Sequence, residues 1–138
     1  MKRKFSIVSG LLFMHLLLFS QERRYDVVFD LTGNDSIVQK SLLRWVDGIL
    51  KANPAANLEV VMYGQGIDLV TNAHAYRPDL ITSLTAKKQV TFVVCEQALK
   101  NHLLDKTDLL PGIRTVPDGI YEIISKQADG WGYIKVAH

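Results

Sequence analysis

Three short runs of apolar residues constrain the fold of this chain more than any other feature. They are YDVVFDL at 25–31, LEVVMY at 58–63 and VTFVVC at 90–95. Runs this short, nearly continuous and rich in β-branched residues are typical of strands that are covered on both faces, and such strands occur mainly in parallel sheets. Because parallel strands need crossover connections, which are usually helices, the runs predict an α/β domain.

The segments between the runs have the helical patterns that such crossovers require. After the first run, Ser36 and Gln39 form an S-x-x-Q capping box, and apolar residues then recur at helical spacing until Asn53-Pro54. Residues 78–86 predict a second helix before the third strand, whereas residues 64–77 have a looser pattern.

The remainder of the chain predicts two further helices and two further strands. A short helix follows Cys95 with an apolar face, residues 113–117 form a short strand, Asp118 caps a helix, and residues 130–136 form the last strand. The helix after Cys95 is expected to have an apolar face of Ala98, Leu99 and Leu103. The helix after Asp118 is expected to have one of Ile120, Ile123, Ile124 and Ala128. Together these strands and helices predict one three-layer α/β/α domain with a mainly parallel five-stranded sheet, spanning residues 21–138.

The first 20 residues have the pattern of a secretory signal peptide. Lys2, Arg3 and Lys4 precede an apolar stretch over residues 5–19, and the small residue Ser20 precedes a polar segment. The stretch is shorter than the roughly 18 to 20 residues that a spanning helix needs, so a membrane anchor is the weaker interpretation. We therefore expect residues 1–20 to be removed and the body to be exported to the periplasm, with no membrane attachment after cleavage.

Charge argues against a nucleic-acid partner. The whole chain has a net charge of +2, but the three leader cations account for this surplus, and the body alone carries −1. The body therefore lacks the excess of positive charge expected of a protein that binds nucleic acids or anionic membranes.

Cys95 is the only cysteine, so no internal disulfide can form. It ends the third strand, and ligands of parallel sheets collect at the carboxyl ends of the strands. Free N–H groups at the start of the following helix favour a thiolate there, as does Lys100, whereas the adjacent Glu96 opposes it. The alternative is an inert core cysteine, since free cysteine is among the most buried residue types.

The loop after the second strand is a weaker candidate. Gly64, Gln65 and Gly66 fall at the same sheet edge as Cys95 and form a candidate ligand loop, although glycines that allow a tight turn are the simpler interpretation. His74 and His102 do not have metal-ligand spacing with Cys95, so neither a metal nor a cofactor is expected. His102 would lie two helical turns from Cys95, about 10 Å along the axis, which makes it a poor general base.

Several motifs together resemble the DsrE/DsrF-like family of small sulfur-relay proteins, and most closely its exported branch. They are EVVMYGQGIDLV, VTFVVCEQAL and DLLPGIRTVPDGIYEIISKQADGWGYIKV, and the resemblance covers about residues 25–136. It implies a three-layer α/β/α fold, assembly into homotrimers or hexamers, and a strand-end cysteine that accepts and passes on sulfane sulfur as a persulfide. By its position in the motif, that role would fall on Cys95.

Two functional hypotheses follow. The first is an exported sulfur carrier with a sulfurtransferase-like thiol at Cys95 and a protein that donates or accepts sulfur. The second is a non-catalytic ligand-binding or oligomeric interaction module, in which Cys95 is structural and the loop of Gly64, Gln65 and Gly66 is the binding feature. The solvent exposure of Cys95 discriminates between them.

Overall fold

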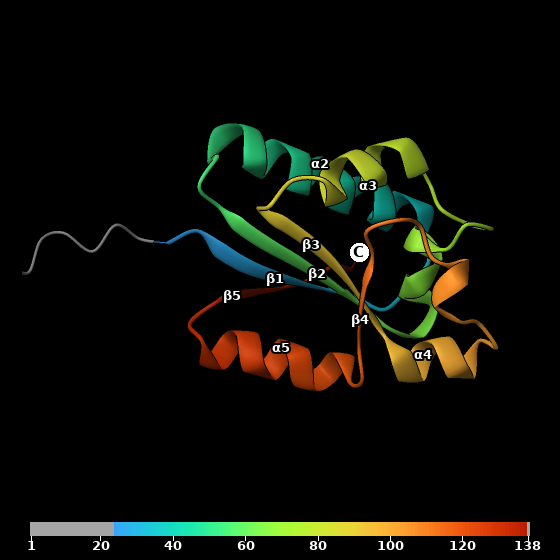
Figure 1. Ribbon diagram of the computed structural model, residues 1–138. Coiled ribbons are helices and arrows are strands. Elements are labelled where there is room, and N and C mark those ends of the chain that lie inside the picture. Colours follow the sequence, from blue (N-terminus) through green and yellow to red (C-terminus); the bar gives the residue numbers. More distant parts are fainter. Residues whose placement is uncertain (1–23, 138) are drawn as a thin grey trace, which may run out of the picture.

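Five parallel strands form one sheet in the order β4-β3-β2-β1-β5 in the computed structural model, which describes residues 24–137 (Figure 1). The strands are β1 (Asp26–Leu31), β2 (Asn57–Met62), β3 (Val90–Cys95), β4 (Arg114–Val116) and β5 (Gly132–Lys135). The helices are α2 (Ser36–Ala52), α3 (Pro78–Thr85), α4 (Glu96–Asn101) and α5 (Gly119–Ala128), with short 3-10 helices η2 (Gly64–Val70) and η3 (Lys106–Asp108).

The order of the strands explains how the helices are divided between the two faces. Strands β1 to β4 are added in one direction, whereas β5 pairs on the other side of β1, with Val28 opposite Tyr133. Since parallel crossovers are right-handed, a connection that reverses direction must cover the opposite face. Accordingly α2 and α3 cover one face and α5 crosses the other (Figure 1). The predicted three-layer α/β/α fold with a five-stranded parallel sheet is confirmed.

The larger core lies between the sheet and the helices α2 and α3. Alternate residues of β1, such as Phe29 and Leu31, are fully buried there against Leu42 and Val46 of α2. The cap of α2 differs from the prediction. The side chain of Asp35, one residue before Ser36, accepts hydrogen bonds from backbone N–H groups of the first turn, because it occupies the N-cap position itself.

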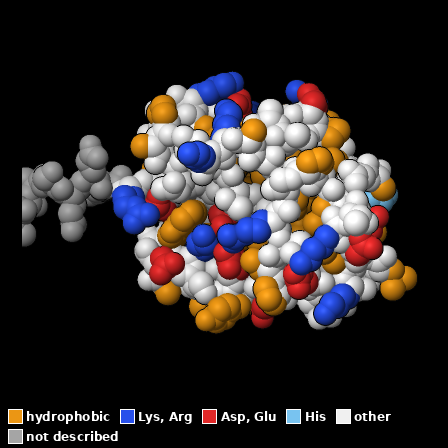
Figure 2. Space-filling model, in the orientation of Figure 1, with side chains coloured by type: hydrophobic (Ala, Val, Ile, Leu, Met, Phe, Trp, Pro, Cys, Tyr) orange, Lys and Arg blue, Asp and Glu red, His pale blue; other side chains and the backbone are white. Residues whose placement is uncertain are grey.

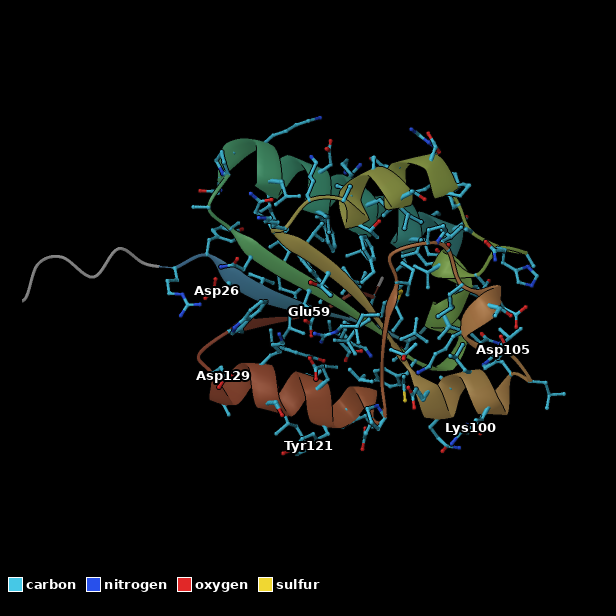
Figure 3. All side chains as sticks on the ribbon, viewed as in Figure 1. Asp26, Glu59, Lys100, Asp105, Tyr121 and Asp129 are labelled. Carbon is cyan, nitrogen blue, oxygen red and sulfur yellow. The ribbon has the colours of Figure 1, made fainter. Side chains whose placement is uncertain are left out.

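The core under α5 is smaller and contains buried charges. Its buried apolar residues are Val28, Val61, Val93, Val116 and Ile123. Glu59 of β2 also points to this side, where Lys126 of α5 contacts its carboxylate at 2.9 Å and Arg114 at 3.5 Å (Figure 3). Burial raises the pKa of Glu59, and the ammonium group of Lys126 opposes this shift.

This charged layer overturns the predicted apolar face of α5. The side of α5 that faces the sheet presents Gly119, Ile123 and Lys126, since Lys126 must reach Glu59. Of the four predicted residues only Ile123 is buried, and Ile120, Ile124 and Ala128 are exposed. Leu103 was also predicted to be apolar core and is exposed, because α4 ends two residues earlier, at Asn101.

Residues 64–77 are more ordered than their sequence predicted. Helix η2 buries Ile67, Leu69 and Val70 against the larger core, and Thr71 forms an antiparallel bridge with Leu109. Within residues 24–137 there is no helix with the length and apolar character needed to span a membrane. The predicted signal peptide, residues 1–20, lies outside the described residues.

Candidate functional site

Cys95 occupies the junction that its sequence context predicted. It is the last residue of β3 and the N-cap residue of α4, with extended backbone angles φ −69° and ψ 122°. Its side chain is buried, with 8% exposed, and makes no capping hydrogen bond. Its Sγ atom is 4.0 Å from the carbonyl oxygen of Pro117. The thiol therefore faces the turn between β4 and α5.

A cleft of about 360 Å³ opens beside this thiol. It is formed by the end of β2, by α4 and by the turn that leads into α5. The residues that line it are Tyr63, Gly64, Cys95, Gln97, Ala98, Asn101, His102, Pro117, Asp118 and Ile120. The cleft thus lies at the carboxyl edge of the sheet, the edge where parallel sheets generally bind ligands.

A glycine allows the first turn of α5 to approach Cys95 closely. A Cβ atom at Gly119 would lie 3.1 Å from Cβ of Cys95 and 3.7 Å from Cδ1 of Tyr63. The first distance is shorter than ordinary van der Waals contact, so a side chain at this position would push the turn away from the thiol. Gly119 therefore allows α5 to begin close to the end of β3.

The three residues of the predicted ligand loop have different places. Gly64 lines the cleft with Cys95, whereas Gln65 is exposed outside the lining. Gly66 is buried, and a Cβ atom there would lie only 2.2 Å from the carbonyl oxygen of Leu31. The glycine is therefore needed for close packing of η2 against β1.

Tyr63 adds a neutral hydroxyl to the cleft region. Burial and the nearby carboxylate of Asp30 raise the pKa of Tyr63 to about 12. Asp30 is itself buried, and its Oδ2 atom accepts hydrogen bonds from Tyr133 at 2.6 Å and from Lys135 at 3.1 Å. Its Oδ1 atom has no hydrogen-bond partner among the described residues. At neutral pH Tyr63 therefore remains a phenol and adds no negative charge near Cys95.

Glu96 was expected to oppose a thiolate at Cys95, but its carboxylate is engaged elsewhere. Its Oε1 atom is 2.8 Å from Nζ of Lys106 and 2.9 Å from the hydroxyl oxygen of Thr115. These contacts, Lys106 foremost, lower the pKa of Glu96. Lys100, the expected compensating cation, lies on the side of α4 that points away from the sheet (Figure 3).

His102 also lines the cleft, as the C-cap residue of α4. The six residues between Cys95 and His102 form that helix, so the sequence placed His102 correctly at its far end. Gln97, Asn101 and Asp118 line the cleft as well and were not predicted to do so, because each has the pattern of an ordinary surface or capping residue. Within residues 24–137 no three histidine, cysteine or carboxylate side chains are grouped as a metal site would require.

Comparisons with known proteins give a family and similar solved structures. The model of the DsrE/DsrF-like family matches residues 27–136. A protein of unknown function from Methanobacterium thermoautotrophicum, MTH1491, has a similar structure, with a TM-score of 0.75 and 28% identity, covering 80% of this chain and 98% of that one. The ychN protein of E. coli has a TM-score of 0.67 and 12% identity, covering 81% and 98%. The search of curated proteins gave no match.

Proposed function

The chain belongs to the DsrE/DsrF-like family, and from this premise we propose that it is a sulfur carrier that holds sulfane sulfur as a persulfide on Cys95. The observation that carries the proposal is the place of Cys95, whose side chain lines a cleft at the carboxyl edge of the sheet. A carrier thiol needs this combination of a largely shielded sulfur and an open approach for its donor.

The transfer step requires no cofactor and no net oxidation. The thiolate of Cys95 attacks the terminal sulfur of a donor persulfide, R–S–SH, and a new bond forms between Sγ and that sulfur. The S–S bond of the donor breaks, and its electron pair leaves with the thiolate R–S⁻. The proton stays on the transferred sulfur. Passage to an acceptor protein repeats the same exchange, with Cys95 as the leaving group.

Alkylation of the folded protein tests whether Cys95 can do this chemistry. A carrier thiol is expected to react with a small alkylating agent at rates that rise between about pH 6 and about pH 9, because only the thiolate is nucleophilic. The rate is followed by the mass of the intact protein. A thiol that reacts only after the addition of denaturant would contradict the proposal.

The burial of Cys95 favours a second candidate function. With 8% of its surface exposed, packed among core residues such as Ala98 and Leu99, the cysteine resembles an inert core residue. The chain would then be a ligand-binding or oligomeric interaction module that uses the same cleft without covalent chemistry. The alkylation experiment separates the two, since the second candidate requires an unreactive thiol in the folded state.

We also propose that the chain assembles into homotrimers or pairs of trimers. Support comes from Ile120, Tyr121 and Ile124, which are 57%, 68% and 55% exposed on the outer side of α5. Figure 2 shows hydrophobic side chains over this helix, and Figure 3 shows Tyr121 pointing away from the sheet. Exposed apolar groups gathered on one helix commonly mark an interface. Since Ile120 also lines the cleft, a second copy would border the site.

The variant Ile124→Asp tests this interface. It is expected to shift the sedimentation of the protein at micromolar concentration from an oligomer to a monomer, because a buried unpaired carboxylate is costly. Ile37→Asp is the matched control, since Ile37 is 63% exposed on α2, in the opposite layer. The control should sediment as the wild type does. A monomeric wild type, or equal effects of both changes, would contradict the proposal.

We propose further that the chain is exported and that residues 1–20 are removed. The proposal rests on the sequence pattern of the leader, with its three cations and following apolar stretch. The mass of the intact protein isolated from its native host is expected to fit a chain that begins near Gln21. A mass that includes Met1 would show that the leader is retained.

A further inference from the structure

We propose that Asp118 is a specificity-determining residue of the Cys95 cleft, and that it selects against anionic sulfur donors. This inference rests on the proposed function and names its substrate class. Sulfur would be delivered by a persulfide with neutral or basic surroundings, such as a cysteine persulfide on a protein segment, and not by a small dianion such as thiosulfate.

The charge of the cleft lining is the first observation. Among residues 24–137, no lysine or arginine belongs to the lining, and Asp118 is its only carboxylate. His102 is the only lining side chain that could gain a positive charge. With Tyr63 held as a neutral phenol, the fixed charge that an incoming donor meets is negative.

The second observation is that the carboxylate of Asp118, which lines the same cleft as Cys95, is held in place by the cap of α5. Its Oδ1 atom accepts hydrogen bonds from the backbone N–H groups of Ile120 at 2.9 Å and Tyr121 at 3.1 Å. Asp118 also follows Pro117, whose carbonyl oxygen is 4.0 Å from Sγ of Cys95. The negative charge therefore cannot turn away from the cleft without loss of the helix cap.

The lysines that lie against Tyr63 and Glu96 are each paired with a carboxylate other than Asp118. Lys135 contacts Asp30 at 3.1 Å, and Lys106 contacts Glu96 at 2.8 Å. Within the described part of the chain, Asp118 has no salt bridge with a lysine or arginine. An anionic donor that approaches the Cys95 thiolate is thus repelled by a second fixed negative charge.

Two alkylating agents of similar size and different charge test the proposal. Iodoacetamide is neutral and iodoacetate is an anion. Both transfer a carbon to Sγ while the C–I bond breaks and iodide leaves. The rate with iodoacetamide is divided by the rate with iodoacetate, first for Cys95 and then for a small free thiol. The first ratio divided by the second is the normalised ratio, and it measures how strongly the protein repels the anion. At low salt the wild type is expected to disfavour iodoacetate by roughly three- to tenfold.

The variants Asp118→Asn and Asp118→Ser remove the charge and keep a side chain that caps helices well. Both are expected to bring the normalised ratio close to one, with thermal melts near that of the wild type. The matched control is His102→Gln, which removes another ionisable side chain from the cleft lining. At pH 8 this variant should have the same normalised rate ratio as the wild type. Loading from thiosulfate, in which Sγ bonds to the outer sulfur while the S–S bond breaks and sulfite leaves, should rise with the same two Asp118 variants.

The outcomes separate this inference from the proposed function. Equal ratios in the wild type and both Asp118 variants would overturn the role of Asp118 and leave the carrier function standing. A second outcome is a normalised rate ratio that falls to about one in the Asp118 variants while the wild-type protein takes up no sulfur from a persulfide donor. That outcome would support the role of Asp118 and contradict the carrier function. A cysteine that neither reagent modifies in the folded protein would overturn both.

Discussion

Cys95→Ser is expected to abolish persulfide loading while lowering the free energy of unfolding by no more than about 1 kcal/mol. Loading is lost completely because serine cannot form a persulfide. The cost in stability is small because residue 95 lines the cleft, where water can hydrogen-bond with the new hydroxyl. The change is measured by incubating the reduced protein with a persulfide donor and determining the mass of the peptide that contains residue 95.

Cys95→Ala and thermal melts complete this experiment. Alanine removes the thiol without adding a polar atom, so it distinguishes loss of chemistry from burial of an unpaired hydroxyl. If Cys95 were a structural core residue, serine would destabilise the protein by as much as about 3 kcal/mol, because a buried hydroxyl without a partner is costly. That result, together with an unreactive wild-type thiol, would contradict the carrier function.

Gly66→Ala is expected to be the most destabilising of the single changes considered, by about 3 kcal/mol or more, which lowers Tm by roughly 10 °C or more. The added Cβ atom would lie 2.2 Å from the carbonyl oxygen of Leu31 and 2.8 Å from its carbonyl carbon. Both atoms are backbone of β1, an interior strand that pairs with β2 and β5, so they cannot move aside without disturbing the sheet. The variant is compared with the wild type by thermal unfolding.

Gly48→Ala is the matched control for this effect. Gly48 lies on the exposed side of α2 and a Cβ atom there would meet nothing within 4 Å. Alanine is expected to stabilise the protein by up to about 1 kcal/mol, since it favours the helix more than glycine does. If Gly66→Ala had the same Tm as the wild type, it would contradict the conclusion that η2 packs too closely on β1 for any side chain at position 66.

The sheet was predictable because its strands are apolar runs with few interruptions. The face under α5 was harder to predict, since Glu59 and Asp30 interrupt those runs and their partners are distant in sequence. Lys126 is the partner of Glu59, and Lys135 that of Asp30. The helical spacing of apolar residues therefore predicted that Ile120 and Ile124 face the sheet. The salt bridge between Lys126 and Glu59 instead decides which side of α5 faces the sheet.

The site was predicted only in part, for a related reason. Cys95 could be placed because the end of a parallel strand and the start of a helix are both visible in the sequence. Asp118 was recognised only as a helix cap, and His102 only as a poor general base. Their place in the same cleft lining as Cys95 depends on where α4 ends and on how close to β3 helix α5 begins, and neither has a local sequence signal.

The mass of the Cys95 peptide from protein purified without reductant shows whether this thiol carries sulfur. We expect an added mass of about 32 Da, one sulfur atom, that disappears on reduction and is regained after incubation with a persulfide donor. A thiol that remains unmodified in the isolated protein and after exposure to the donor would contradict a sulfur-carrying role for Cys95.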